Sequence, residues 1–488
     1  MRDRFRLLVL LAVVLAACSE DATPPSTSVT PSPSSPASPS PAALATPPDL
    51  SARPLIWFAP LPPMLRPGRP FIGSEDFMDL FEADADWELA ASRIGVFKLY
   101  GEWVAYLATD QQLRTAVQEI ARRGMVLAVE MGPLDPPAGC GSGVESFAGI
   151  DEGRLISRRI RQAGGTLQVI ALDEPYYYAH LYSGTNACHW SIDRVATAVA
   201  GFRDAMRAEW PSLILGDIEP MPTSVSPDGL AAWLDAYALA AGEPFAFLHL
   251  DMDWGRTSWP ALGVAVESAG SSRGVPIGII YNGGSTTSDF LWLAAAGRRV
   301  LAYETDAGAR PDHVVFQSWM DKPDRVLPES DSATFTSLVN RYFDDRGSLG
   351  ELAGDTGSLA LYKAATSSSA YGDATAERAV DGDADTLWNA GRGAPAWIEI
   401  DLGSAQPVAA IRLLVQQTPS GLTHHRVTCA PAPDVVATLL SNLEGETESL
   451  QVLTVTLDPA VSCWIIRIET VSSPSWVAWR EIEVIGAP

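Results

Sequence analysis

The most chemically suggestive part of the sequence is a short apolar run, 168–172, that ends in two adjacent carboxylates, Asp173 and Glu174. The apolar residues predict a buried strand, and Pro175, which has no amide hydrogen, predicts that the strand ends there. Three tyrosines follow at 176–178. Carboxylates beside aromatic rings suit sugar chemistry, in which an acid protonates a glycosidic oxygen and the rings stack on pyranose faces. The alternative for this stretch alone is a solvated acidic turn.

Similar residues recur where other predicted strands end. Five carboxylates are the catalytic candidates: Glu174, Glu219, Asp253, Asp251 and Asp173. The candidate substrate-binding residues are Lys98, Tyr100, Glu130, Tyr176, Tyr177, Trp254, Tyr281, Asn282 and Trp319. Each also has a structural alternative: Glu130 could be a buried partner of Lys98, and some of the aromatic residues could be packing.

These residues need a scaffold that brings strand ends together. Short apolar runs alternate with helix-like segments between residues 54 and 343, as at 55–59, 94–100, 125–131, 167–173, 213–217, 245–251, 276–281 and 313–319. Eight such units predict an α/β fold, a (β/α)8 TIM barrel at 53–344, whose active site lies at the C-terminal ends of the strands. A doubly wound open sheet is the alternative, but no Gly-rich phosphate-binding turn follows the first strand.

After a linker rich in Gly, Ser and Asp at 345–358, the apolar pattern changes. Apolar and polar residues alternate with a period near two at 397–402, 410–415, 450–457 and 464–469, with turn residues between the runs. This pattern predicts an antiparallel β-sandwich at 359–488.

Four motifs in this region occur in a recognisable order. They are Ala379-Val380-Asp381-Gly382-Asp383-Ala384-Asp385-Thr386-Leu387-Trp388, Trp397-Ile398-Glu399-Ile400-Asp401-Leu402-Gly403, Ile411-Arg412-Leu413 and Trp479-Arg480-Glu481-Ile482-Glu483-Val484. They resemble the discoidin (coagulation factor 5/8 type C) domain, a jelly roll whose bacterial members are commonly carbohydrate-binding modules. The resemblance implies a structural calcium held by Asp381, Asp383, Thr386 and Glu481, which offer the oxygen ligands that Ca²⁺ prefers. An Asx-rich turn without metal is the alternative.

Glu174-Pro175 resembles the Asn-Glu-Pro signature of barrel glycosidases, and the match is partial. The resemblance implies that Glu174 is the acid/base and that Asp173 contacts the sugar 2-hydroxyl. Those enzymes carry a nucleophilic Glu on strand seven, where this chain has Tyr281-Asn282. We therefore predict Glu174 as the acid with Asp253 or Glu219 as nucleophile or base. A strand-four/strand-six pair, or substrate assistance steadied by Asp173, remains open.

The N-terminus has the pattern of a targeting segment. A basic start at 1–6 and an apolar stretch at 7–17 precede Leu15-Ala16-Ala17-Cys18, which resembles a bacterial lipobox. The resemblance implies cleavage before Cys18 and lipidation of its thiol. Residues 19–52 are rich in Pro, Ser and Thr and predict a disordered tether. We expect an extracytoplasmic protein that is lipid-anchored to the bacterial cell envelope.

The remaining four cysteines fit that location. Outside the cytoplasm they are expected to form two disulfides, and the simplest pairing within domains is Cys140–Cys188 and Cys429–Cys463. None of the four has metal-ligand spacing.

The charge balance excludes one class of partner. With 59 acidic against 34 basic residues, the chain carries a formal net charge of −25 and shows no basic patch for phosphate groups. Nucleic acid and anionic membrane surfaces are therefore not expected as main partners. We expect a monomer, no catalytic cofactor and a carbohydrate partner.

The sequence supports three hypotheses. The first is a surface-anchored glycoside hydrolase that cleaves a polysaccharide or glycoconjugate by carboxylate acid/base chemistry. The second is a non-catalytic carbohydrate-binding or adhesion lipoprotein, suggested by the missing acid on strand seven. The third is a metal-dependent hydrolase that uses His249, Asp251 and Asp253.

Overall fold

The computed structural model describes residues 48–65, 72–221, 225–254, 258–284, 289–320, 322–349, 358–382 and 386–487. The predicted targeting segment with Cys18, the tether up to residue 47, linker residues 350–357 and Asp383 lie outside these ranges. In the part that is described, no helix has the length and apolar character needed to cross a membrane.

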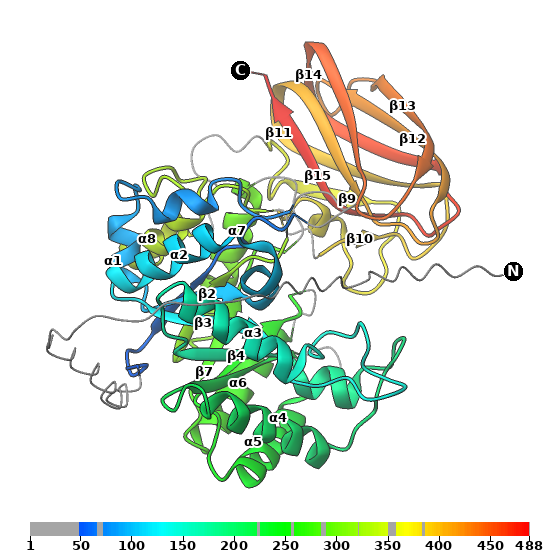
Figure 1. The fold of residues 1–488 in the computed structure, drawn as a ribbon. Coiled ribbons are helices and arrows are strands. Elements are labelled where there is room, and N and C mark those ends of the chain that lie inside the picture. The colour runs from blue at the N-terminus through cyan, green and yellow to red at the C-terminus, as the bar shows by residue number, and fades with distance from the viewer. Residues whose placement is uncertain are drawn as a thin grey trace, which may run out of the picture. The chain divides into compact units, whose positions relative to one another are not determined.

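Parallel strands close into an eight-stranded barrel in chain order, with β8 pairing back to β1. Figure 1 labels β2, β3, β4 and β7 of this barrel among the helices. The strands are β1 (Leu55–Ala59), β2 (Val96–Tyr100), β3 (Val126–Met131), β4 (Val169–Asp173), β5 (Ile214–Met221), β6 (Leu248–Met252), β7 (Ile277–Tyr281) and β8 (His313–Gln317). The predicted TIM barrel is confirmed.

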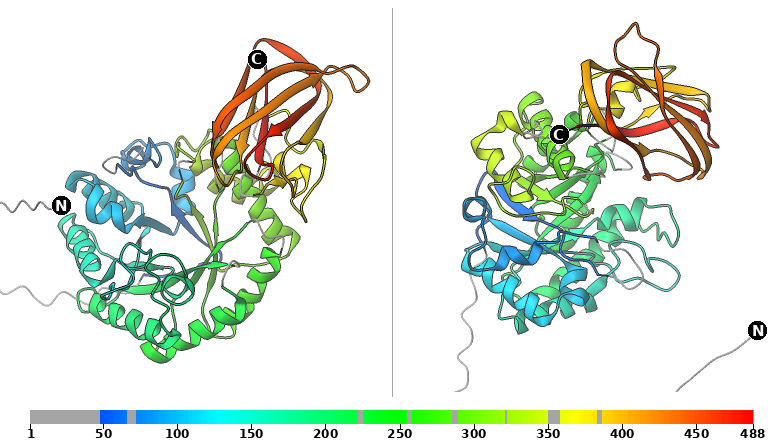
Figure 2. Two further views of the ribbon diagram at one scale, coloured as in Figure 1. Left: turned by 90° about the vertical axis from the view of Figure 1, so that its right-hand side faces the viewer. Right: turned by 90° about the horizontal axis from the view of Figure 1, so that it is seen from above.

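Helices surround the barrel strands (Figure 2). They are α1 (Glu88–Arg93), α2 (Asp110–Arg122), α3 (Gly149–Gln162), α4 (Ile192–Arg207), α5 (Pro227–Ala241), α6 (Trp259–Ser271), α7 (Asp289–Val300) and α8 (Phe335–Asp344). Shorter segments are the 3-10 helices η1 (Phe77–Phe81) and η5 (Arg346–Ser348) and the π-helices η2 (Trp103–Leu107), η3 (Tyr177–Leu181) and η4 (Leu301–Asp306). Leu349, after η5, is buried in the barrel's outer core.

Local sequence sets the helix boundaries where caps are present. The hydroxyl of Thr109 accepts the Gln112 amide at 3.2 Å, and the Gln112 side chain accepts the Thr109 amide at 2.9 Å, so α2 begins with a capping box. Its apolar face, which includes Leu113 and Val117, is buried against the barrel.

The two faces of the barrel strands have separate cores. Alternate residues, among them Trp57, Ala171 and Phe247, form a small cluster inside the barrel, and the residues between them pack against the helices. His249 and His313 also face inward, and their Nε2 and Nδ1 atoms lie 2.9 Å apart. β7 offers this pair space because it carries Gly278, where a Cβ would lie 2.6 Å from the ring of His249.

The C-terminal domain is antiparallel. A further 3-10 helix, η6 (Ala376–Ala379), accompanies strands β9 (Ala364–Ser367), β10 (Trp388–Asn389), β11 (Ala396–Val415), β12 (Gly421–Ala430), β13 (Thr438–Thr447), β14 (Val452–Ser472) and β15 (Ala478–Gly486). The strand order is β10-β15-β11-β14-β12-β13, with β9 on β11. Trp388 and Trp479 are cross-strand partners in the core. The predicted antiparallel β-sandwich is confirmed.

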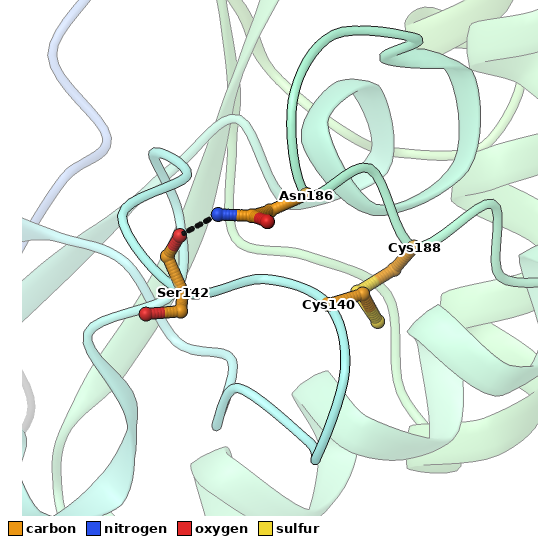
Figure 3. Close-up of a disulfide and its surroundings, with 4 residues drawn as sticks. All are labelled: Cys140, Ser142, Asn186 and Cys188. Atoms are coloured by element: carbon orange, nitrogen blue, oxygen red, sulfur yellow. Dashed lines mark hydrogen bonds between the residues drawn. A yellow bond between two sulfur atoms is a disulfide. The ribbon is translucent and has the colours of Figure 1, made fainter.

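Both predicted disulfides are present, one in each domain. Cys140–Cys188 joins the loop that follows β3 to the loop that follows η3 (Figure 3). Beside it, Asn186 Nδ2 donates to the Ser142 carbonyl at 2.7 Å, and the Gly141 amide donates to the Asn186 carbonyl at 2.8 Å. These contacts fix two loops that belong to the same end of the barrel.

The two disulfides differ in exposure, so we expect them to be reduced in a fixed order. Cys140 and Cys188 are partly exposed, whereas Cys429 and Cys463 are 2% and 0% exposed. Because thiol–disulfide exchange needs access to sulfur, Cys140–Cys188 should react faster by about tenfold or more in the folded chain. Mild reduction, alkylation and mass spectrometry measure this order. Denatured chain should lose the difference, and faster reduction of Cys429–Cys463 in the folded chain would contradict the prediction.

Candidate active site

A cavity of about 790 Å³ lies at the C-terminal ends of the barrel strands. Its floor is made by inward-facing residues from successive strands: Tyr100, Glu130, Asp173, Pro220, Asp251 and Gln317. These positions continue the alternation that places Trp57 and Ala171 inside the barrel. The parallel strands thus bring carboxylates that are far apart in sequence to one wall.

A buried lysine organises one side of the floor. Lys98 is fully buried, and its Nζ donates to Glu130 Oε2 and Gln317 Oε1, both at 2.5 Å. Gln317 Nε2 also donates to Glu130 Oε2 at 2.9 Å. A buried ammonium needs such partners, so this network holds Glu130 in place. Glu130 is therefore both the partner of Lys98 and part of the cavity wall.

Asp173 and Glu174 reach the same cavity by different routes. Asp173, the last residue of β4, has the inward orientation of its strand. A regular strand would turn Glu174 outward, but its φ of 49° ends the extended backbone and its carboxyl lines the cavity. A non-glycine residue in this region costs about 1–3 kcal/mol, and such strain clusters at functional sites. Glu174 is only 9% exposed.

The charges around these two carboxyls favour their neutral forms. Burial, then the charges of Asp251 and Asp173, raise the pKa of Glu174 well above its usual value. Burial, Glu130 and Glu145 raise the pKa of Asp173, which Lys98 lowers in part. Among the described residues, neither side chain has a hydrogen-bond partner. A buried carboxyl that keeps its proton toward neutral pH can act as a general acid.

Asp251 and Asp253 have different positions. Asp251 faces inward on β6 and lines the cavity. Of the neighbouring charges, that of Asp251 raises the pKa of Glu174 the most. The strand ends at Met252, so Asp253 lies beyond it and is not among the residues that line this cavity. Because Asp253 lies outside β6, the prediction that the two aspartates share one face of this strand is wrong.

Glu219 is buried on the helix-facing side of β5 rather than at the cavity. Its two carboxylate oxygens accept the amides of Tyr176 at 2.7 Å and Tyr177 at 3.0 Å. These amides begin η3, so Glu219 holds the π-helix against the end of β5. The side chain is fully buried. In this position it supports the site without lining it.

Four predicted binding residues, Tyr176, Trp254, Tyr281 and Asn282, are not among the residues that line this cavity. The ring of Tyr176 stacks on Trp233 with centroids 5.6 Å apart. Tyr281 is fully buried on the outer face of β7, and its hydroxyl lies 3.0 Å from Glu304 Oε1. Asn282 and Trp254 both contact Arg299. Arg299 Nη1 donates to the Asn282 side-chain oxygen at 2.9 Å, and the guanidinium of Arg299 lies 4.7 Å from the ring centroid of Trp254.

Tyr177 and Trp319 do line the cavity, as Tyr100 and Glu130 do. Both rings are partly exposed. They give the acidic cavity aromatic surface of the kind on which sugar rings stack.

Three carboxylates that line the cavity, Glu102, Glu145 and Glu152, were not among the predicted site residues. Tyr178, from η3, donates to Glu145 Oε2 at 2.5 Å, and Tyr106 donates to Glu152 Oε2 at 2.9 Å. The loop that carries Glu145 folds close to β3 because Gly132 has no side chain: a Cβ there would lie 2.4 Å from the Ser146 carbonyl carbon. The predicted pairing of Cys140 with Cys188 was the sequence signal that two loops meet here.

The predicted metal-dependent arrangement is not formed by the described residues. His249 is bonded to His313 within the barrel, its ring packs on Trp57 and Phe247, and burial lowers its pKa. No group of three or more His, Cys, Asp or Glu side chains in the described ranges is arranged to hold a metal ion.

The predicted calcium ligands of the C-terminal domain lie close together where they are described. Thr386 Oγ1 donates to the Asp381 carboxylate at 2.9 Å, and the Gly382 amide donates to Glu481 at 3.2 Å. Burial and the charge of Asp381 raise the pKa of Glu481. Two neighbouring carboxylates in a buried setting fit a hard cation. Calcium stays a prediction, because Asp383 lies outside the described residues.

A second hollow, of about 610 Å³, lies within the C-terminal domain between Asn389, Gln416 and Trp476. Trp476 is 51% exposed, and its ring lies edge-on to Tyr371 at 5.6 Å between centroids. An exposed tryptophan beside a polar hollow is a suitable platform for a sugar ring.

Comparisons with known proteins identify this second domain. No curated protein matches the chain. Among solved structures, a chitosan-binding module of a chitosanase/glucanase from Paenibacillus sp. IK-5 is 28% identical, with 26% of this chain and 98% of the module covered and a TM-score of 0.24. The family 32 carbohydrate-binding module of NanJ from C. perfringens, in complex with galactose, is 24% identical, with 25% and 93% covered and a TM-score of 0.23. The model of the F5/8 type C domain matches residues 363–482, and this part of the chain is an F5/8 type C (discoidin) domain.

Proposed function

We propose that the barrel is a glycoside hydrolase and that the F5/8 type C domain is its carbohydrate-binding module. The observation that carries the proposal is Glu174: a carboxyl in strained backbone, nine-tenths buried, without a described hydrogen-bond partner, at the catalytic end of a TIM barrel. Structural carboxylates are normally satisfied by donors, as Glu219 is.

In the proposed reaction Glu174 gives its proton to the glycosidic oxygen as the bond to the anomeric carbon breaks. Asp251, whose charge acts most strongly on Glu174, is the second carboxylate, either attacking the anomeric carbon or activating water. The exposed faces of Tyr177 and Trp319 hold the sugar, and the Lys98–Glu130–Gln317 network fixes the floor beneath it. Asp173 is placed to contact a substituent of the same sugar.

The location of the enzyme is also part of the proposal. Cys18 would carry a lipid and residues 19–52 would form the tether, so both domains would be displayed outside the cytoplasmic membrane. The two disulfides support an oxidising compartment. The alternative of a purely sugar-binding lipoprotein leaves the strained and buried Glu174 without a role.

A first prediction concerns the two catalytic carboxylates. On a glycan that the wild-type chain cleaves, Glu174→Gln and Asp251→Asn should each lower kcat by about 10²- to 10⁴-fold, because each removes a proton donor or a nucleophile/base. Asp253→Asn should retain activity within about threefold, since Asp253 does not line the cavity. Product formation is measured by chromatography, and the product anomer by NMR. Equal activity of wild type and Glu174→Gln would rule out Glu174 as the acid.

A second prediction follows from the raised pKa of Glu174. Between the pKa of a free glutamate and the raised pKa, the folded state holds a proton that the unfolded state has lost, so the free energy of unfolding falls as pH rises. Glu174→Gln should remove this slope, which is at most about 1.4 kcal/mol per pH unit. The variant should therefore be more stable than wild type at pH 8 and nearly equal at pH 4.

Urea denaturation across this pH range makes the measurement. Asp151→Asn is the control, because Asp151 is on the exposed surface of α3 and its side chain is 99% exposed. A Glu174→Gln variant with the wild-type slope would contradict the prediction.

A third prediction separates the two domains. Trp476→Ala should weaken binding to an insoluble glycan by about tenfold, which corresponds to about 1.4 kcal/mol, because alanine offers no ring face on which a sugar can stack. It should leave kcat on short soluble substrates unchanged. Sedimentation binding and soluble-substrate kinetics test the two effects. Loss of both together with a lower melting temperature would indicate a folding defect instead.

A further inference from the structure

The cavity of the barrel is acidic to an extent that glycoside hydrolysis does not require. Two carboxylates suffice for that chemistry. Besides Asp173, Glu174 and Asp251, the lining contains four more: Glu102, Glu130, Glu145 and Glu152. Among the described lining residues none is Lys, Arg or His. The nearby Lys98 lies beneath the floor and is bonded to Glu130.

We propose that the substrate of this site is an amino sugar oligomer that carries free, protonated amines. This inference rests on the proposed function and names its substrate class. The ammonium groups neutralise the cavity wall, and the sugar rings stack on its aromatic residues.

The distribution of the carboxylates favours several separate cationic groups over one ion. The seven side chains come from β3, β4 and β6, from the start of α3 and from the loops that follow β2, β3 and β4, so they are spread along the side of the cavity that β2 to β6 form. No three of them are arranged to hold a metal ion. A chain of sugars with one amine per ring presents positive charge at intervals, which matches a distributed set of carboxylates.

The unpartnered carboxyl of Glu174 is an independent observation that points to the same ligand. Its side chain is nine-tenths buried, lines the cavity and has no hydrogen-bond partner among the described residues. The surrounding charges are of the same sign as its own. A buried polar group is normally satisfied, and an ammonium or hydroxyl donor from a ligand would satisfy this one.

Aromatic residues favour a sugar over a basic peptide. Tyr177, Tyr178 and Trp319 are partly exposed and line the same cavity. Such rings stack on the apolar face of a sugar, and they attract an ammonium group through their π-electrons. An amino sugar uses both properties at once.

Glu152 allows charge recognition to be tested apart from catalysis. It stands at the rim, at the start of α3, and the largest effects on the pKa of Glu174 come from burial and from other carboxylates. Its neighbour Asp151 has a 99% exposed side chain and does not line the cavity. Glu152→Gln removes one negative charge inside the site. Asp151→Asn removes one negative charge at the neighbouring position, outside the site.

The experiment measures binding to full chain that carries Glu174→Gln, to prevent cleavage, and Trp476→Ala, to weaken the second domain. The probes are a β-1,4-linked glucosamine hexamer and an α-1,4-linked galactosamine hexamer, each beside its N-acetylated counterpart, and a hexalysine peptide. At least one amine-bearing oligomer should bind about tenfold or more tightly than its acetylated form, with affinity that falls as salt rises. Added Glu152→Gln should weaken that binding by about three- to tenfold, whereas Asp151→Asn should change it less than twofold.

Each other outcome overturns the proposal. If the acetylated oligomers bind as tightly as the amine-bearing ones, the site does not recognise the positive charge of the amines. If hexalysine binds as tightly as the amino sugar oligomers, the site recognises positive charge alone and not the sugar. If neither amino sugar oligomer binds with a Kd below about 1 mM, amino sugars are excluded as the substrate class. Hydrolysis is scored separately with wild-type chain, so amine-selective binding without product would leave this inference standing and contradict the proposed hydrolase.

Discussion

Repulsion among like charges at the mouth of the barrel is the constraint on which the rest of the structure depends. Burial and neighbouring carboxylates raise the pKa values of both Asp173 and Glu174, so the site favours protonated forms. Keeping such groups together is destabilising, and the fold offsets this with apolar packing on both faces of the strands. Lys98 is bonded to Glu130 and lowers the pKa of Asp173 only in part, so burial and the neighbouring carboxylates still set the direction of the shift at Asp173.

A strand residue reaches the site only if its side chain points into the barrel rather than outward toward the helices. Strand positions and chain order are predictable from the apolar runs, because a barrel strand is buried on both faces. The same double burial hides which face of a strand looks inward. The side chains that point into the barrel include Lys98, Glu130 and Asp251. Those of Glu219 and Tyr281 point outward and pack against other elements. A sequence that is apolar on both faces contains no signal to separate the two sets.

Loop residues were less predictable than strand residues for a different reason. Glu145 reaches the cavity through a close approach at Gly132, a disulfide to the next loop and a hydrogen bond from Tyr178. Each of these is a tertiary contact between segments whose lengths do not determine their path. In the C-terminal domain, by contrast, alternating patterns and ordered motifs were sufficient to predict the sandwich, since its strands have one buried face.

Glu174 and Glu219 show why burial alone does not identify a catalytic carboxylate. Both are glutamates at the ends of adjacent strands, both precede a proline, and burial raises the pKa of both. Glu219 accepts two backbone amides and thereby positions η3, which supplies Tyr177 to the cavity. Glu174 has no described donor, and its left-handed backbone directs it into the open space. The difference in satisfied hydrogen bonds assigns support to one residue and chemistry to the other, and a sequence cannot show that difference because the donors to Glu219 lie on a neighbouring strand's loop.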